Sequence, residues 1–274
     1  FCAGQRVALR FGSVTHTAKV WLIGQLIAQH KGGFTPFEAD VTALLQPGET
    51  ALLTVACDNR VNHSTLPVGN EDGQLAFFGS DNAGIPSVEA AKRAAAPQNR
   101  PNFDFFNYAG IHRPVWLYTT PKEYIEDVTV VPAVDGTVQY AVKTTGSAPA
   151  HVTVLDADGK AVASAEGAEG TITIPEVHLW EPRPGTPYLY TLHITCGADV
   201  YDQTFGVRSI EARGTRVLLN GKPLYFKGFC KHEDFTAHGR GFDPVLNVKD
   251  VNLIHWANAN AVRTSHYPYA EEIY

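Results

Sequence analysis

Apolar side chains take every second position in several short stretches of the first half of the chain. The stretch "RVALRF" (6–11) has this period of two, which predicts a strand with one buried face. The stretch 18–33 predicts a hairpin that turns near Gly24, and the stretches 49–59 and 114–121 predict two further strands. Short strands that are separated by Gly, Pro, Asn and Asp predict an antiparallel β-sandwich.

A second run of alternating stretches extends from about 124 to 211. Apolar and polar residues alternate over 138–142, and 188–196 predicts a long strand. The dipeptide Asp158-Gly159 predicts a type I′ turn, in which both central residues have positive φ. About seven short strands in a segment of this length predict an immunoglobulin-like sandwich.

Residues 62–102 interrupt the strands of the first half. Turn residues lie at both ends of this segment, and 88–96 predicts a short helix with Ser87 as its N-cap. An insertion of this length in a sandwich is either a functional loop or a flexible loop without function, and the sequence favours neither interpretation.

A different pattern begins after the second sandwich. Asn220-Gly221 predicts a hairpin whose second strand, 224–229, is nearly all apolar, which is typical of a parallel strand buried on both faces. Apolar residues then recur at helical spacing over 245–258, and 261–265 predicts another strand. A strand, a helix and a strand with right-handed crossover form the repeating unit of a (β/α)8 barrel. Because such a strand has a neighbour on each side, we expect other polypeptide to cover 224–229.

Composition narrows the classes of function. The 274 residues are 44% hydrophobic and 11% aromatic, so the chain can form sizeable cores. Only 18% of residues are charged and the net charge is −6, which gives no electrostatic footprint for nucleic acid or an anionic membrane. No apolar run approaches the roughly 20 residues that span a bilayer. We therefore predict neither nucleic acid nor membrane as a partner.

Four cysteines, Cys2, Cys57, Cys196 and Cys230, are widely scattered along the chain and match no metal or redox spacing. We interpret them as reduced, mostly buried thiols of a cytoplasmic protein, with one disulfide as the alternative. Because the first residue is Phe1 and not methionine, loss of a secretion leader stays open.

Polar residues follow the two strands that resemble those of a barrel. His232, Glu233 and Asp234 follow the first strand, and His266 and Tyr267 follow the second. Ligands of parallel barrels bind where the strands end, so we expect His232 and His266 at one mouth, where they could hold sugar hydroxyls. Glu233 and Asp234 are neighbours at one strand end and point apart, so we do not predict them as a catalytic pair.

Two other interpretations of this edge stay open. One is a metal site formed by His232, Asp234, His238 and His266, although no HxxxH-like helical spacing supports it. The other is a salt-bridged network that supports the barrel rim. We predict no metal and no cofactor.

Six stretches resemble glycoside hydrolase family 2, in the order of that family's domains. They are "GGFTPFEADVT" (32–42) and "NFDFFNYAGIHRPVWLY" (102–118) for its sugar-binding sandwich, "LWEPRPGTPYLYTL" (179–192) and "FGVRSI" (205–210) for its middle domain, and "GFCKHED" (228–234) and "NAVRTSHYP" (260–268) for its barrel.

The resemblance implies a mainly β fold in three parts. Residues 1–122 are then a jelly-roll-like sugar-binding β-sandwich, incomplete at its start. Residues 123–211 are an immunoglobulin-like β-sandwich, and residues 212–274 are the first strands of a (β/α)8 TIM barrel. The resemblance also implies a homo-oligomer, a dimer or a tetramer, for the full enzyme.

Within the family, "DFFNYAGIHR" followed by "RTSHYPYAEE" resembles the β-glucuronidases more than the β-galactosidases. This implies a retaining exo-glycosidase that hydrolyses β-D-glucuronides to D-glucuronate and an alcohol, with two glutamates about 5–5.5 Å apart. The resemblance places both glutamates on later barrel strands, so we expect them beyond Tyr274 and expect the isolated chain to be inactive. A β-galactosidase or β-mannosidase is one alternative, and a non-catalytic carbohydrate-binding or assembly module is another.

The resemblance also assigns roles to residues of this chain. It implies that Asp104 accepts glucuronate hydroxyls, that His266 bonds a ring hydroxyl, and that His232 lies in the same sugar site. It implies supporting roles for Arg263, a fixed cation that props the carboxylates, and for Tyr267. A turn-capping aspartate and packed core histidines are the structural alternatives.

Overall fold

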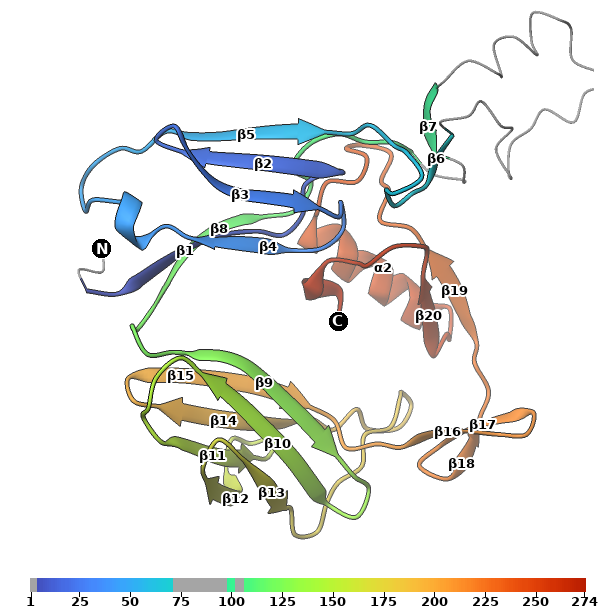
Figure 1. The fold of residues 1–274 in the computed structure, drawn as a ribbon. Helices are drawn as coiled ribbons and strands as arrows, with labels where there is room; N and C mark the ends of the chain where they lie inside the picture. The colour runs from blue at the N-terminus through green and yellow to red at the C-terminus, as the bar shows by residue number, and fades with distance from the viewer. Residues whose placement is uncertain (1–3, 71–97, 102–105) are drawn as a thin grey trace, which may run out of the picture.

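The structure is a computed structural model that describes residues 4–70, 98–101 and 106–274. The helix expected over 88–96 and the candidate Asp104 lie outside these residues. The described chain is mainly β, as predicted, and forms two sandwiches followed by a short parallel sheet with one α-helix (Figure 1). A bilayer-spanning helix is absent from this part of the chain.

Two antiparallel sheets form the first sandwich, with strand orders β4-β1-β8 and β3-β2-β5. Apolar residues of β1 and β2 fill its core, including Leu9, Phe11 and Val20. The predicted hairpin at Gly24 is confirmed, with positive φ at Ile23 (50°) and Gly24 (76°). The elements are β1 (Arg6–Phe11), β2 (Thr17–Leu22), β3 (Gln25–Lys31), β4 (Phe37–Asp40), η1 (Thr42–Leu44), β5 (Leu53–Asp58) and β8 (Val115–Thr120), with β6 (Gly69–Asn70) and β7 (Gln98–Pro101) as a separate pair.

The second sandwich has the strand orders β13-β10-β9 and β12-β11-β14-β15. Its core follows from period-two alternation, because Val138, Tyr140 and Val142 of β10 are buried while the residues between them are exposed. The elements are β9 (Ile125–Pro132), β10 (Thr137–Thr144), β11 (Ala150–Leu155), β12 (Ala161–Glu166), β13 (Glu169–Thr173), β14 (Tyr190–Cys196) and β15 (Asp199–Phe205).

The type I′ turn predicted at Asp158-Gly159 is wrong, because only Gly159 has a positive φ (79°). Asp156 sets the turn: its Oδ1 accepts the backbone N–H groups of Asp158 and Lys160 at 3.0 and 2.9 Å. A side chain that bonds the backbone two residues later favours a different turn type.

The last part of the chain holds the antiparallel strands β16 (Ile210–Arg213), β17 (Arg216–Leu219) and β18 (Lys222–Leu224), followed by the parallel pair β19 (Gly228–Lys231) and β20 (Ala261–Thr264). Helix α2 (Pro244–Trp256) connects β19 to β20, and η2 (Glu271–Ile273) follows. Asp243 caps α2 by accepting the N–H groups of Val245 and Leu246. The predicted strand–helix–strand unit is therefore confirmed.

The strand predicted over 224–229 is wrong in its extent, because β18 ends at Leu224 and β19 begins at Gly228. Tyr225 and Phe226 are 80% and 55% exposed, so this chain does not itself provide the expected cover. That other polypeptide covers them stays a prediction, as do the domain limits 1–122, 123–211 and 212–274. The thiols also differ from expectation, because Cys57 and Cys230 are exposed and Cys196 is buried.

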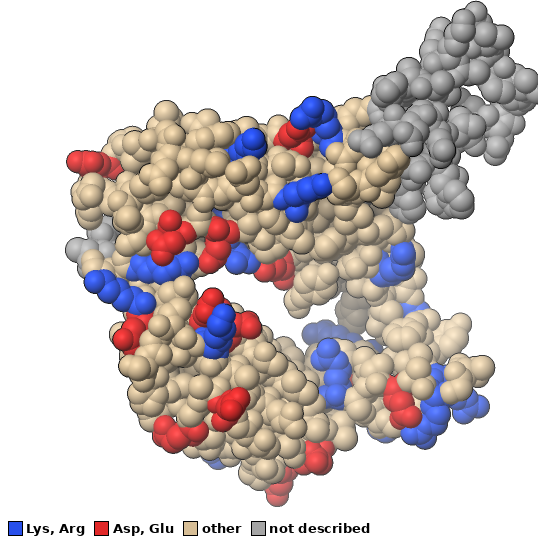
Figure 2. Space-filling model, in the orientation of Figure 1, with Lys and Arg blue, Asp and Glu red and all other residues tan. Residues whose placement is uncertain are grey.

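Figure 1 places β19, β20 and α2 beside the first sandwich, while the second sandwich lies below it. On the face that Figure 2 shows, Lys and Arg side chains lie among Asp and Glu side chains and form no continuous basic patch. The arrangement brings the loops of the first sandwich against the ends of β19 and β20, which is where the polar residues of interest lie.

Candidate functional site

His232 and His266 lie together at one edge of the parallel pair. His232 directly follows β19, and His266 follows β20 by two residues. Parallel strands end at the same edge of a sheet, and the two rings accordingly meet edge to face, with centroids 5.3 Å apart. The expectation that the two strand ends bring these histidines together is confirmed. We call the residues that follow β19 and β20 the strand-end edge.

Arg263 fixes the hydrogen-bonding state of His266. Its Nη1 lies 3.0 Å from His266 Nδ1 and 3.0 Å from Ser265 Oγ. A guanidinium only donates, so Nδ1 accepts and the neutral ring carries its proton on Nε2. In this structure the Arg263 side chain lies against this histidine and this serine; that it props carboxylates stays a prediction. The N–H of the neutral His266 ring therefore lies on Nε2, and an N–H is the kind of group that a hydroxyl oxygen accepts from.

The neighbouring carboxylates point to different partners. Both Asp234 oxygens lie 3.2 Å from Arg240 Nη2, and its Oδ2 lies 3.8 Å from His232 Nδ1. Glu233 turns the other way, toward Arg113 at 3.2 Å. This agrees with successive side chains at a strand end facing opposite sides.

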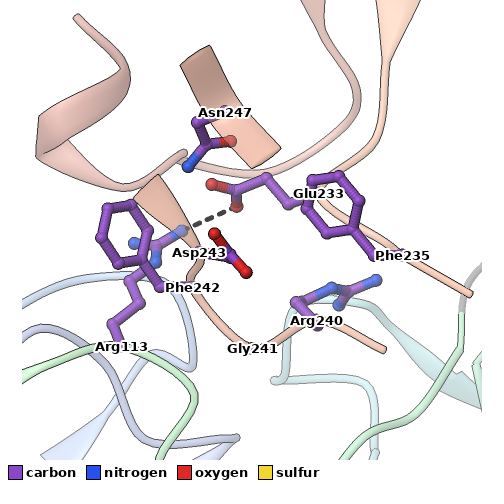
Figure 3. Close-up of a pocket in the computed structure, with 8 residues that line it drawn as sticks. All are labelled: Arg113, Glu233, Phe235, Arg240, Gly241, Phe242, Asp243 and Asn247. Carbon is purple, nitrogen blue, oxygen red and sulfur yellow. Dashed lines mark hydrogen bonds and ion pairs between the residues drawn. The ribbon is translucent and has the colours of Figure 1, made fainter. Parts of the chain in front are cut away.

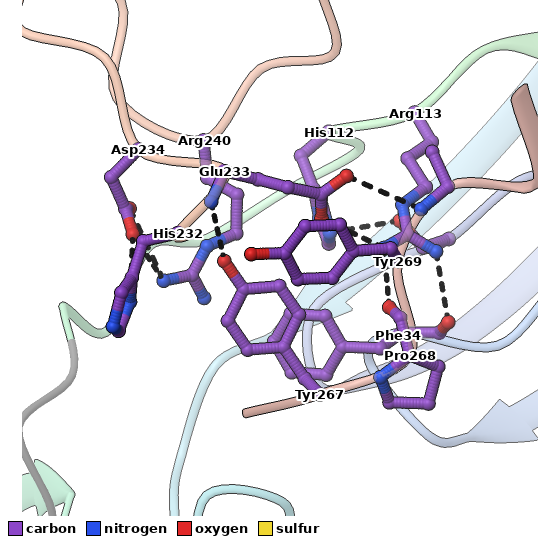
Figure 4. A network of polar contacts seen from close by, with 12 residues as sticks. Phe34, His112, Arg113, His232, Glu233, Asp234, Arg240, Tyr267, Pro268 and Tyr269 are labelled. Atoms are coloured by element: carbon purple, nitrogen blue, oxygen red, sulfur yellow. Dashed lines mark hydrogen bonds and ion pairs between the residues drawn. The ribbon is translucent and has the colours of Figure 1, made fainter. Parts of the chain in front are cut away.

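Arg113 clamps the first sandwich onto the strand-end edge (Figure 4). Its Nη1 donates to the Phe34 carbonyl at 2.9 Å, and its Nη2 donates to Glu233 Oε2 at 3.2 Å and to the Pro268 carbonyl at 2.6 Å. Glu233 Oε1 in turn accepts the Ala270 N–H at 3.2 Å. The side chains of Arg113 and Glu233 are only 5% and 8% exposed, so this ion pair is buried and its polar atoms are hydrogen-bonded.

Tyr267 belongs to an aromatic stack beside that clamp. Its ring stacks on Phe34 at 4.5 Å and on Tyr269 at 5.3 Å, and its hydroxyl accepts the Glu233 N–H at 2.9 Å. Burial raises the pKa of the Tyr267 hydroxyl and of the Tyr269 hydroxyl, so both stay protonated. Tyr267 therefore holds the loop after β19 against the loop after β20.

The space beside the clamp is not a ligand pocket. Figure 3 shows the side chains around it, and no water-sized room remains between them. Arg113, Glu233, Arg240 and Asn247 among them are buried, and side chains packed this closely form the interior of an interface. The residues that line it are Arg113, Glu233, Phe235, Arg240, Gly241, Phe242, Asp243 and Asn247.

The metal interpretation gains no support from the described residues. Among them, no group of three or more His, Cys, Asp and Glu side chains could hold a metal ion. His238 pairs with the α2 cap instead, with its Nε2 3.6 Å from Asp243 Oδ2.

Sequence patterns missed a partly buried polar group in the first sandwich. His112 Nε2 lies 3.0 Å from Ser13 Oγ, and His112 Nδ1 lies 2.7 Å from Thr15 Oγ1. Burial, followed by the positive charges of Arg113 and Arg240, lowers the pKa of His112 to about 3. His112 is therefore neutral at physiological pH, and the stretch "GIHR" alone gives no sign of that burial.

We expect His112 to make the first sandwich sensitive to acid. Above pH 6.5 the His112 imidazole is neutral in both the folded and the unfolded chain. Between pH 6.5 and about pH 3 the unfolded chain binds a proton at His112, whereas the folded chain does not. Stability is therefore lost as the pH falls, by about 2 kcal/mol at pH 5. Hydrogen exchange of β1 and β2 measures this, and His112→Gln should remove that loss. Equal losses in His112→Gln and wild type would contradict it, and the exposed His151→Gln serves as control.

Comparisons with known proteins cover almost the whole chain. Three family models match consecutive segments: "Glycosyl hydrolases family 2, sugar binding domain" over 2–121, "Glycosyl hydrolases family 2" over 123–208, and "Glycosyl hydrolases family 2, TIM barrel domain" over 210–274. A curated relative, the beta-glucuronidase of Paenibacillus borealis, is 42% identical over 282 residues, which are 99% of this chain and 45% of that protein.

Solved structures give the same result. A Faecalibacterium prausnitzii beta-glucuronidase is 96% identical with a TM-score of 0.93, covering 100% of this chain and 46% of that one. A Bifidobacterium dentium beta-glucuronidase complexed with coumarin-3-O-glucuronide is 50% identical with a TM-score of 0.89, covering 99% and 48%. The chain thus spans about 45% of the length of the curated relative. Its two sandwiches and its parallel strand pair match the three models of one family in order, and the chain belongs to glycoside hydrolase family 2.

Proposed function

We propose that the whole protein is a retaining exo-β-glucuronidase, which releases D-glucuronate and an alcohol from β-D-glucuronides. The observation that carries this proposal is the pairing of His232 and His266 at the strand-end edge, in a chain whose relatives are beta-glucuronidases. One of them was solved with coumarin-3-O-glucuronide bound. The resemblance also leads us to propose a dimer or tetramer for the whole protein.

This chain contributes sugar binding, and not the bond-breaking groups. In our proposal His266 donates its Nε2–H to a ring hydroxyl, while His232 and Asp104 hold neighbouring hydroxyls. Arg263 keeps His266 in the donating tautomer, and Tyr267 supports both loops. Retaining hydrolysis needs one carboxyl group to protonate the leaving oxygen and a second, about 5–5.5 Å away, to attack the anomeric carbon. We assign those two glutamates to later barrel strands.

A chimera tests the proposal. These residues replace their counterpart in the Faecalibacterium prausnitzii beta-glucuronidase, to which they are 96% identical, and turnover of p-nitrophenyl β-D-glucuronide is measured. We expect the chimera to be active and the isolated chain to give no turnover above a blank. A chimera that cleaves the galactoside and not the glucuronide would sink the proposed substrate. Turnover by the isolated chain would show that the catalytic groups are misassigned.

In that chimera, His266→Ala is expected to lower kcat/KM for the glucuronide at least about tenfold, since a lost sugar hydrogen bond costs roughly 1.4 kcal/mol of transition-state stabilisation. The remote His193→Ala, whose ring pairs with Asp202 in the second sandwich, is the matched control and should keep the wild-type value. Equal kinetics in the two variants would remove His266 from the sugar site.

A further inference from the structure

The guanidinium group of Arg240 is enclosed between the first sandwich and the strand-end edge. Its side chain is only 2% exposed. The Tyr267 ring lies 4.6 Å from it, the Phe34 ring 5.4 Å and the Tyr108 ring 5.5 Å. Phe34 and Tyr108 come from the first sandwich, so a single cation contacts aromatic faces on both sides of the interface. Such faces attract a cation most strongly where water is excluded.

The loop that carries Arg240 is held close to Tyr108. Gly239, the preceding residue, has a φ of +67°, and a Cβ at that position would lie 2.7 Å from Tyr108 Cε1. Glycine is the residue that tolerates both the positive φ and the close approach. The backbone conformation at Gly239 therefore directs the Arg240 side chain toward these aromatic rings.

From that fixed position Arg240 reaches the histidines through one intermediary. Its Nη2 lies 3.2 Å from both oxygens of Asp234, and Asp234 Oδ2 lies 3.8 Å from His232 Nδ1. Figure 4 shows the Asp234 carboxylate with dashed lines to both His232 and Arg240. A carboxylate held by a buried cation has a defined orientation, and the imidazole beside it stands edge to face against His266.

We propose that Arg240 is a positioning residue for sugar binding, which acts through Asp234 on His232 and its neighbour His266. The inference rests on the proposed function of this edge and adds to it a residue that touches no sugar. Arg240 ties the orientation of the histidine pair to the seating of the first sandwich. If Arg240 only stabilised the interface by packing, its replacement would leave the affinity for the substrate unchanged.

The test uses kinetics of the chimera with p-nitrophenyl β-D-glucuronide. Arg240→Met, which keeps an unbranched apolar side chain but removes the cation, should raise KM about tenfold and leave kcat within about threefold, because ground-state and transition-state binding weaken together. Asp234→Asn should reproduce this effect. Arg240→Lys keeps a positive charge beside Asp234 but loses the planar group that lies over the three rings, so its KM should fall between those of Arg240→Met and wild type.

Arg60→Met is the matched control, because Arg60 also pairs with an aspartate, Asp58, but its side chain is 82% exposed. Wild-type KM values in both Arg240→Met and Asp234→Asn would overturn the inference, and so would a lowered melting temperature with unchanged KM. If Arg240→Met does not fold, Asp234→Asn decides alone: a KM raised about tenfold supports the inference, and a wild-type KM overturns it. Loss of glucuronide turnover in the unmutated chimera would instead overturn the proposed function.

Discussion

Replacing Arg113 by methionine is expected to lower the free energy of opening at the strand-end edge by about 3–5 kcal/mol, because removing one partner leaves a buried charge uncompensated. Glu233 would keep the Ala270 N–H but lose the cation at 3.2 Å. The carbonyls of Phe34 and Pro268 would lose their donor as well. Hydrogen exchange over 228–241 and 261–274 in the full chain measures the opening, and it should accelerate by about two to three and a half orders of magnitude, at about 1.4 kcal/mol per factor of ten.

A double variant distinguishes the effect of losing the Arg113 cation from the effect of leaving the Glu233 carboxylate buried without a partner. Arg113→Met with Glu233→Leu leaves no uncompensated charge, so it should be closer to wild type than the single variant. A single variant within 1 kcal/mol of wild type, or a double variant that is no better, would contradict the importance of the clamp.

Local patterns were sufficient for the strands whose one face is buried. Alternation in 138–142 predicts β10, and Val138, Tyr140 and Val142 are indeed its buried residues. Helical spacing over 245–258 predicts α2, and the strand on each side of it predicts the parallel pair. In β10 the period of the side chains reports directly which face the strand buries. In α2 it predicts the helix but not a buried face, because Val251 and Leu253 are about half exposed and Asn247 is the buried residue.

An apolar run was not sufficient where side chains take over the backbone hydrogen bonds. In the predicted strand 224–229, Asn260 Oδ1 accepts the Lys227 N–H at 2.8 Å, and Asn260 Nδ2 donates to the Tyr225 carbonyl at 3.1 Å. A side chain that bonds backbone groups competes with a strand ladder, so β18 stops at Leu224 and β19 starts at Gly228. Asn260 lies 33 residues along the chain from Lys227, so the apolar residues of 224–229 alone do not reveal that its side chain bonds their backbone.

In the candidate site, too, some residues are predicted by local sequence patterns and others are not. The positions of His232 and His266 after two predicted parallel strands predict that they lie at one edge, because parallel strands end together, and their rings do meet there. The clamp residues Arg113 and Glu233 are 120 residues apart, and no period or spacing joins them. Arg240 likewise had no local signal, since its partners Phe34, Tyr108 and Tyr267 come from distant parts of the chain. Contacts between domains are set by tertiary packing, which single-sequence patterns do not encode.

Phe34→Ala is the second change from which we expect a large effect, a loss of about 3–5 kcal/mol in opening free energy at the same edge. The Phe34 side chain is 2% exposed, stacks on Tyr267 at 4.5 Å and meets His112 edge-on at 5.7 Å. Truncation of Phe34 leaves a cavity between the first sandwich and the strand-end edge. It also removes one of the three aromatic rings around the Arg240 guanidinium. The Phe34 carbonyl still accepts from Arg113, so the variant isolates the contribution of the ring from that of the clamp.

Phe37→Ala is the matched control for that variant, because Phe37 stacks on Phe11 at 5.0 Å and on His30 at 4.5 Å, all within the first sandwich. It should speed exchange in β1 and β4 and leave exchange over 261–274 unchanged, whereas Phe34→Ala should speed exchange over 261–274 most. The same exchange pattern in both variants would mean that Phe34 only supports its own sandwich. Faster exchange confined to 228–241 and 261–274 in Phe34→Ala would mean that its ring couples the sandwich to the histidine pair, because the sandwich core stays closed while the strand ends open.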